Sequence, residues 1–227
     1  MLASYKREAL LPNILTHLTR KPPKSLRHIV VVWQEVGEPL PNCLNTASLD
    51  QYAALSGVVI HVRKSKTNSM NERFRPVLDW HDPIPTKAVM ILDDDVVLLP
   101  DTLEWGYQRY LAANADAEAK RIVGFSPRDV EVLPGPYDLE DDSDSLVPVE
   151  KRKWKYLFQP RETYSMILSN AAWFDRSWLE KYWEDTAEMR SMRDYVDEGT
   201  YFYGTRNRNK EKSSFSTDLQ SSIATIC

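Results

Sequence analysis

Five short apolar runs, separated by polar stretches, constrain this chain more than any other feature of its sequence. The runs cover residues 28–33, 58–62, 88–92, 121–125 and 164–168. The first run reads His-Ile-Val-Val-Val-Trp, which is typical of a strand buried on both faces. Helical spacing of apolar residues predicts helices over 7–19, 44–55 and 171–183, and Asp101 with Glu104 predicts a capping box that opens another helix. Strands that alternate with helices predict an α/β layer fold with a mostly parallel sheet.

Composition excludes several classes of protein. The 29 Lys and Arg residues are balanced by 33 Asp and Glu residues, so no basic surface for nucleic acid is expected. Only 7 of the 227 residues are Gly, and the sequence contains neither a G-x-G-x-x-G motif for a dinucleotide nor a Walker A motif for a nucleoside triphosphate. No run approaches the roughly 18 apolar residues of a membrane span, and the charges at residues 6–8 interrupt any leader peptide.

Two segments lack a regular pattern. Residues 134–155 carry an acidic stretch followed by a basic one, which predicts an exposed loop. Residues 199–227 show no periodicity and end in Ser- and Thr-rich sequence, so we expect them to be disordered. Cys43 and Cys227 lie too far apart in the sequence to make a metal-binding motif.

The triplet Asp93-Asp94-Asp95 directly follows the run 88–92. Ligands of open α/β sheets bind beyond the carboxyl ends of the strands, where these carboxylates are expected. Adjacent carboxylates repel one another, and they suit a hard divalent cation such as Mg²⁺ or Mn²⁺ that also contacts phosphate. A solvated acidic turn is the alternative, and the triplet alone leaves both interpretations open.

Two further polar clusters follow predicted strands or precede predicted helices. In the segment Asn-Ser-Met-Asn-Glu-Arg-Phe, Asn68 and Arg73 could donate hydrogen bonds to a base or a phosphate. The alternative is a helix capped by Asn68 with Arg73 on the surface. The cluster Tyr5-Lys6-Arg7 falls where a strand end would meet a helix, and taken alone it is interpreted as the charged first turn of that helix.

Taken together, these segments resemble glycosyltransferase family 64, the exostosin-like family. The resemblance covers residues 3–198 and rests on six motifs in family order: SYKREALLPNIL (4–15), IVVVWQEVGEP (29–39), NSMNERF (68–74), AVMILDDDVVL (88–98), RIVGFSPRDV (121–130) and YSMILSNAAWF (164–174). It implies a GT-A α/β/α sandwich and a metal-dependent, retaining transfer of a sugar, of N-acetylhexosamine type or related, from a UDP-sugar to a glycan or glycoconjugate acceptor. By the same likeness we expect a compartment of the secretory pathway, in the Golgi or the endoplasmic reticulum.

The resemblance also implies site residues. The residues that match donor-binding positions are Tyr5, Arg7, Gln34, Asn68, Arg73, Asp93 and Asp94. Asp95 matches the ligand of Mn²⁺ (or Mg²⁺), and the residues that match the wall facing the acceptor are Tyr164, Ser165 and Asn170.

The chain departs from the family pattern at both ends. The likeness stops at Glu198, before the segment that carries the family's catalytic carboxylate and Arg, so no catalytic residue is assigned. We therefore expect a partial glycosyltransferase domain over 1–198, an unrelated tail over 199–227 and an incomplete first strand at residues 1–3. A non-catalytic relative that binds UDP-sugar or a partner protein is the alternative function.

Overall fold

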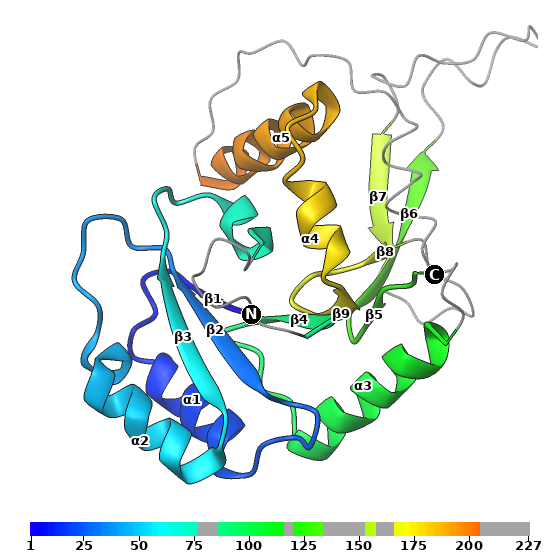
Figure 1. Cartoon of the computed structure of the whole chain (residues 1–227). Coiled ribbons are helices and arrows are strands. Elements are labelled where there is room, and N and C mark those ends of the chain that lie inside the picture. Colours follow the sequence, from blue (N-terminus) through cyan, green and yellow to red (C-terminus); the bar gives the residue numbers. More distant parts are fainter. Residues whose placement is uncertain (77–85, 116–119, 134–152, 158–165, 205–227) are drawn as a thin grey trace, which may run out of the picture.

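The computed structural model describes residues 1–76, 86–115, 120–133, 153–157 and 166–204. Its main sheet has six strands in the order β3-β2-β1-β4-β9-β5 (Figure 1). The strands are β1 (Leu2–Ser4), β2 (His28–Trp33), β3 (Val59–Lys64), β4 (Ala88–Asp93), β5 (Val123–Gly124) and β9 (Ala171–Asp175). The first four are parallel, and β9 lies antiparallel between β4 and β5. The expected α/β fold with a mostly parallel sheet is confirmed.

The short strand β1 occupies the middle of this sheet. Leu2 lies opposite Val31 of β2 and opposite Leu92 of β4, and all three residues of β1 are buried. The Met1 amine also donates a hydrogen bond to the carbonyl of Met90, at 2.5 Å. The segment expected to be an incomplete strand is therefore paired on both sides.

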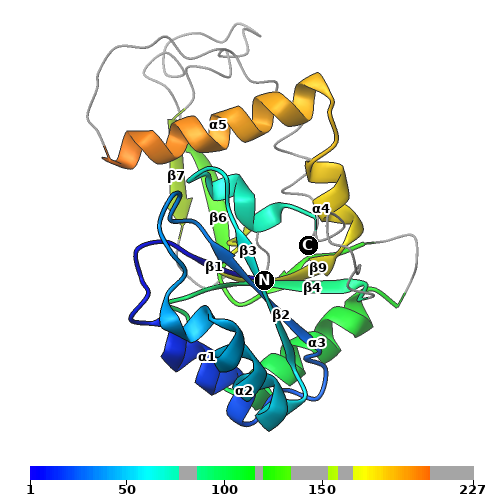
Figure 2. The same cartoon turned by 60° about the vertical axis from the view of Figure 1, so that its left-hand side comes forward.

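Three helices cover one face of the sheet, as Figures 1 and 2 show. They are α1 (Leu11–Arg20), α2 (Thr46–Ser56) and α3 (Pro100–Ala113). The largest core cluster joins apolar residues of α1 and α3 to one side of β2, where Ile29, Val31 and Trp33 alternate toward the helices. Burial of such side chains contributes roughly 1.5–3 kcal/mol each, so this layer anchors the parallel strands.

Two helices and a 3₁₀ turn lie over the opposite face (Figures 1 and 2). These are α4 (Ser177–Tyr182), α5 (Ala187–Gly204) and η2 (Met70–Phe74). Leu179 of α4 packs on Val89 and Ile91 of β4, and Phe74 of η2 joins the same cluster. The molecule is thus an α/β/α sandwich, as expected, because both faces of β2 and β4 carry apolar side chains.

The helix expected over 171–183 is wrong in its first part. Residues 171–175 form β9, which pairs with β4 and β5, and only Ser177–Tyr182 is helical. All of Ala171–Phe174 is buried, so pairing at the sheet and burial on two faces outweigh the helix preference of the two alanines. The run 164–168 contributes β8 (Met166–Ile167) to a separate small sheet.

Three smaller expectations are also corrected. The small sheet contains β6 (Pro127–Leu133) and β7 (Lys153–Leu157), so the end of the expected loop 134–155 is a strand; its other residues lie outside the described part. Helix α5 continues through Gly204, so residues 199–204 of the expected disordered tail are helical, while 205–227 lie outside the described part. The expected capping box of Asp101 and Glu104 is not formed. Helix α3 begins after Leu99 without a side-chain cap, with Pro100 in its first turn, and Glu104 accepts a hydrogen bond from the Ser25 amide, at 2.8 Å.

A short 3₁₀ helix, η1 (Asn42–Leu44), follows β2 and leads into α2. Asn45 caps α2 by accepting a hydrogen bond from the Ser48 amide, at 2.9 Å, and Gly57 ends it with a φ of 70°. None of the described helices has the length and apolarity that a bilayer crossing requires.

Candidate functional site

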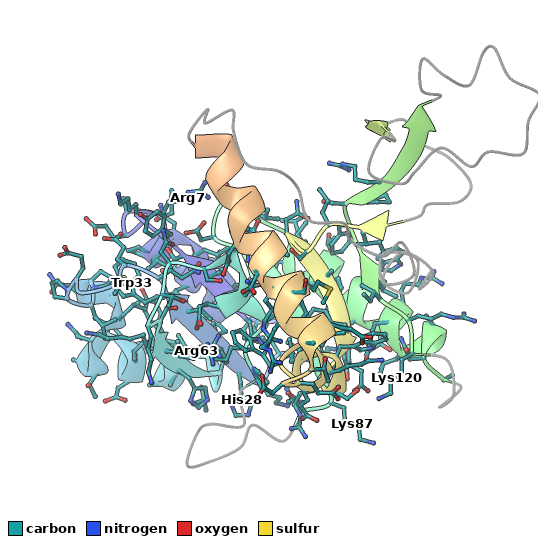
Figure 3. All side chains as sticks on the ribbon, turned by 90° about the horizontal axis from the view of Figure 1, so that it is seen from above. Arg7, His28, Trp33, Arg63, Lys87 and Lys120 are labelled. Atoms are coloured by element: carbon teal, nitrogen blue, oxygen red, sulfur yellow. The ribbon has the colours of Figure 1, made fainter. Side chains whose placement is uncertain are left out.

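The acidic triplet lies where the parallel strands end. Asp93 is the last residue of β4, and Asp94 and Asp95 form the turn that follows. Arg7, from the segment after β1, reaches the same edge; in Figure 3 it lies across the molecule from His28 and Lys87, which mark the starts of β2 and β4. Parallel strands carry their carboxyl ends to one edge, which is why residues far apart in the sequence meet here.

Arg7 binds two of the three carboxylates. Its guanidinium donates to Asp94 Oδ1 at 2.9 Å and to Asp95 Oδ2 at 2.6 Å, and these two bonds raise the pKa of Arg7 above its ordinary value. Asp94 is only 5% exposed, whereas the side chains of Arg7 and Asp95 are 47% and 49% exposed. Exposed ion pairs contribute at most about 1 kcal/mol, so a ligand can replace the Arg7–Asp95 pair at small cost.

Arg73 of η2 binds the third carboxylate. Its Nη1 donates to Asp93 Oδ1 at 2.6 Å, and both side chains are largely buried. Burial raises the pKa of Asp93 above its ordinary value, the Arg73 charge opposes that rise, and Asp95 and Asp94 add to it. Three carboxylates and two guanidinium groups leave the cluster with one formal negative charge.

The cluster fits a divalent cation that is shared with a phosphate. Asp94 Oδ2 is buried and has no hydrogen-bond partner among the described residues, and burying an unpaired carboxylate oxygen is costly. Asp95 beside it is half exposed. Mg²⁺ is typically held by one or two carboxylates together with substrate phosphates, so this pair is a sufficient protein contribution. Among the described residues, no group of three or more His, Cys, Asp or Glu side chains is arranged so that it could hold a metal ion by itself.

The other expected donor residues, Tyr5, Gln34 and Asn68, lie in the segments that follow β1, β2 and β3. Tyr5 precedes Arg7 and is 40% exposed, and Lys6 between them has a φ of 54°, which turns the backbone sharply. Asn68 lies exposed in the segment before η2. Gln34, just after β2, is buried, and its amide donates to the Ser69 carbonyl at 2.6 Å, so a protein contact joins it to the segment 68–74.

Of the expected acceptor-facing residues, the structure describes only Asn170. Its carbonyl accepts a hydrogen bond from the Asp93 amide at 2.9 Å, which brings the start of β9 beside the triplet. Asn170 Oδ1 is buried without a partner among the described residues. Tyr164 and Ser165 lie outside the described part of the chain.

Two residues that hold the segment 68–74 in place cannot be recognised from the sequence. Ser69 and Asn71 lie within the NSMNERF motif, but nothing distinguished them from surface residues. The structure shows Asn71 only 1% exposed and bonded to α4 and α5, and Ser69 bonded to Asp197 of α5. A buried Asn needs partners, but the partners lie more than 100 residues later in the sequence, and spacing does not reveal them.

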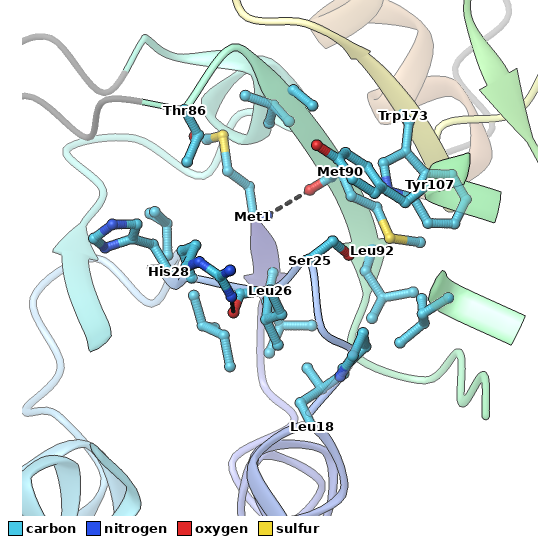
Figure 4. Close-up of a pocket in the computed structure, with 18 of the residues that line it drawn as sticks. Met1, Leu18, Ser25, Leu26, His28, Thr86, Met90, Leu92, Tyr107 and Trp173 are labelled. Carbon is cyan, nitrogen blue, oxygen red and sulfur yellow. Dashed lines mark hydrogen bonds between the residues drawn. The ribbon is translucent and has the colours of Figure 1, made fainter. Parts of the chain in front are cut away.

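A cavity of about 140 Å³ lies at the opposite edge of the sheet (Figure 4). It is lined by residues at the starts of β1, β2 and β4 and by side chains of α1 and α3, among them Met1, Leu18, His28, Met90 and Tyr107. Because the strands run away from this cavity toward the acidic triplet, it is separate from the candidate site.

Comparisons with known proteins agree with this geometry. The family model described as glycosyl transferase family 64 domain matches residues 1–201. Glucosamine inositolphosphorylceramide transferase 1 of Oryza sativa subsp. indica is 31% identical over 175 residues, which are 76% of this chain and 18% of that protein. Human exostosin-2 is 27% identical over 177 residues, 78% of this chain and 20% of that protein. The chain spans about a fifth of the length of these relatives.

A third relative matches over more of its own length. Glycosylinositol phosphorylceramide mannosyl transferase 1 of Arabidopsis thaliana is 27% identical over 218 residues, 93% of this chain and 55% of that protein. The α/β/α sandwich and the family match together define a domain of the glycosyltransferase class. The chain belongs to glycosyl transferase family 64.

Proposed function

We propose that this glycosyltransferase takes its sugar from a UDP-sugar, with a divalent cation at Asp95, and transfers it to a glycan or glycoconjugate with retention of the anomeric configuration. The observation that carries the proposal is the cluster of Asp93, Asp94 and Asp95 with Arg7 and Arg73. It combines carboxylates that can bind a cation with two guanidinium groups that can bind a diphosphate, at the edge where α/β proteins bind ligands.

The roles of the individual side chains follow from their exposure. Asp95 is the accessible carboxylate and would hold Mn²⁺ (or Mg²⁺), with Asp94 behind it. A bound cation of this kind supplies Lewis-acid stabilisation of the charge that develops on a departing diphosphate. Arg7 contacts the same two carboxylates and can turn toward a phosphate once a cation neutralises them.

The remaining candidate residues would place the donor and the acceptor. Tyr5, Gln34 and Asn68 lie in the segments that follow β1, β2 and β3, and we assign them to the nucleoside end of the donor. Asp93, fixed by Arg73 and by Asn170, would support the ribose and phosphate positions. Asn170, with Tyr164 and Ser165 from the preceding segment, would face the acceptor.

The names of the relatives suggest the class of acceptor. Two of them are named as inositolphosphorylceramide glycosyltransferases and one as an exostosin. A glycoconjugate acceptor agrees with the two names that contain inositolphosphorylceramide or glycosylinositol phosphorylceramide. Donor sugar and acceptor are therefore best tested with a panel that includes a glycosylinositol phosphorylceramide and an oligosaccharide.

Calorimetric titration of UDP in the presence and absence of Mn²⁺ tests the donor and metal parts of the proposal. We expect Mn²⁺ to strengthen UDP binding, and Asp95→Ala to remove that gain. The matched control is Asp50→Ala, which deletes an exposed carboxylate on α2. Equal Mn²⁺ dependence in Asp95→Ala and in the wild-type chain would overturn the metal assignment.

A sugar-transfer assay then separates the two functions left open by the sequence. Release of UDP from a UDP-sugar that depends on Mn²⁺ and on acceptor supports the transferase. Tight UDP binding with no release of UDP over the whole panel would instead support the non-catalytic UDP-binding relative.

A further inference from the structure

The side chain of Asn71 joins the segment 68–74, which contains η2, to both helices on its side of the sheet. Its Nδ2 donates to the Arg193 carbonyl of α5 at 2.8 Å, and its Oδ1 accepts from the Tyr182 hydroxyl of α4. Burial raises the pKa of Tyr182 to about 12, so its hydroxyl remains a donor at neutral pH. At 1% exposure, Asn71 has no room to contact a substrate itself.

Ser69 makes a second link from the same turn to α5. Its Oγ donates to the two carboxylate oxygens of Asp197 at 2.6 and 2.8 Å, and it accepts from the Asn71 amide at 3.0 Å. Its carbonyl accepts from Gln34 at 2.6 Å. Ser69 therefore ties the end of β2 and the start of η2 to one carboxylate of α5.

The other end of the turn is held by β3. Arg63 Nη1 donates to the Arg75 carbonyl at 2.9 Å, and Nη2 donates to the Glu72 carbonyl. Arg75 itself lies over the Trp183 ring at 3.9 Å, directly after α4. Only Arg73, between these fixed points, points to the acidic triplet and binds Asp93.

We propose that Asn71 is a positioning residue for the donor site: held by Tyr182 and α5, it sets η2 so that Arg73 meets Asp93. This inference rests on the proposed function, because it assigns Arg73 to the donor site. Rotation or shift of a short 3₁₀ turn by about 1 Å is enough to break a hydrogen bond of ordinary geometry. Through Asn71, α4 and α5 thereby position the guanidinium of Arg73, which belongs to neither helix.

Tyr182→Phe tests the proposal with the smallest change. It removes the hydroxyl that donates a hydrogen bond to Asn71 Oδ1. It keeps the ring that packs on Phe74, with ring centroids 5.1 Å apart. The matched control is Tyr110→Phe, which removes another buried hydroxyl, from α3 on the opposite face of the sheet. We expect the Kd for UDP with Mn²⁺ to rise roughly three- to tenfold in Tyr182→Phe, the factor for one lost hydrogen bond, and to stay unchanged in the control.

A double-mutant cycle separates positioning from a general loss of stability. If Asn71 acts through Arg73, Tyr182→Phe weakens UDP binding in the wild-type background and has no further effect in an Arg73→Met background. Both measurements are made at low temperature, with folding of each variant verified by circular dichroism. The Asn71→Ala variant, which removes the whole side chain, should show a larger effect in the same direction and the same dependence on Arg73.

The outcomes distinguish this inference from the proposed function. Failure of the wild-type chain to bind UDP or a UDP-sugar would overturn the proposed function. Binding by the wild-type chain together with an unchanged Kd in Tyr182→Phe, or additive effects of Tyr182→Phe and Arg73→Met, would overturn the positioning role alone.

Discussion

Replacing Arg73 by Met should destabilise the protein and make its stability depend on pH. The substitution removes the guanidinium that donates to Asp93 at 2.6 Å and keeps most of the buried aliphatic volume. Breaking a fully buried ion pair costs roughly 3–5 kcal/mol. The side chains of Arg73 and Asp93 are 11% and 27% exposed, so screening by solvent reduces the expected loss to about 2–3 kcal/mol.

The pH dependence has a definite sign. The pKa of Asp93 is already above its ordinary value because of burial, and loss of Arg73 removes the main charge that opposes this rise. In the folded variant Asp93 therefore binds a proton at a pH where the unfolded chain has lost it. A carboxyl group with a raised pKa in the folded state lowers stability as the pH rises from its unfolded pKa through its folded pKa. The deficit of Arg73→Met should consequently be smaller at pH 5 than at pH 7.5.

Urea denaturation of both proteins at these two pH values measures the effect. The control is Arg190→Met, which breaks an Arg–Asp pair whose side chains are 52% and 86% exposed and should cost less than about 0.5 kcal/mol. A second substitution, Asp93→Asn, should restore most of the stability of Arg73→Met, because it removes the unpaired charge. The reasoning fails if Arg73→Met loses no more than Arg190→Met, or if its deficit is the same at both pH values.

Three further changes test other parts of the structure. Arg7→Gln should change the free energy of unfolding by less than about 1 kcal/mol, because Arg7 is half exposed, yet weaken Mn²⁺-dependent UDP binding in calorimetry; unchanged binding would exclude Arg7 from the site. Gly106→Ala should destabilise by roughly 1–3 kcal/mol in urea denaturation, although Ala normally favours a helix, because the new Cβ would lie 2.5 Å from the Trp173 ring; a stabilised variant would contradict this packing. Burial lowers the pKa of His28 and of its neighbour His61, so the wild-type chain should lose stability as the pH falls below about 6.5, and His28→Gln should lose less; equal pH profiles would refute this.

The sequence predicts the parallel strands β2, β3 and β4 because each of them carries its signal locally. The apolar run His28–Trp33 is buried on both faces, as its composition indicates, and Asp93 ends the strand at the point where the charges begin. The meeting of Arg7 with the triplet is expected only from the family resemblance, which assigns both to the donor site, because residues 1–3 carry no strand signal of their own. The common end of the other parallel strands follows from their direction.

The sequence does not predict features that depend on distant partners. Residues 171–175 have two alanines and helical spacing, and only pairing with β4 and β5 makes them a strand. The sequence around Asn71 is typical of a surface residue, and only its hydrogen bonds with Tyr182 and Arg193 show that it is buried. The basic residues around Lys153 predict a loop, because local composition does not indicate that β7 pairs with β6.

The central position of β1 has a consequence for the order of folding. Residues 2–4 pair with residues 31–33 on one side and with Leu92 and Asp93 on the other, so the middle of the sheet closes a loop of about ninety residues. Pairings of such long sequence separation are slow to form. Residues 2–4 therefore cannot complete their pairing before the residues just ahead of Asp94 and Asp95 have been synthesised, and the strand that precedes Arg7 and the strand that precedes its carboxylate partners become ordered together.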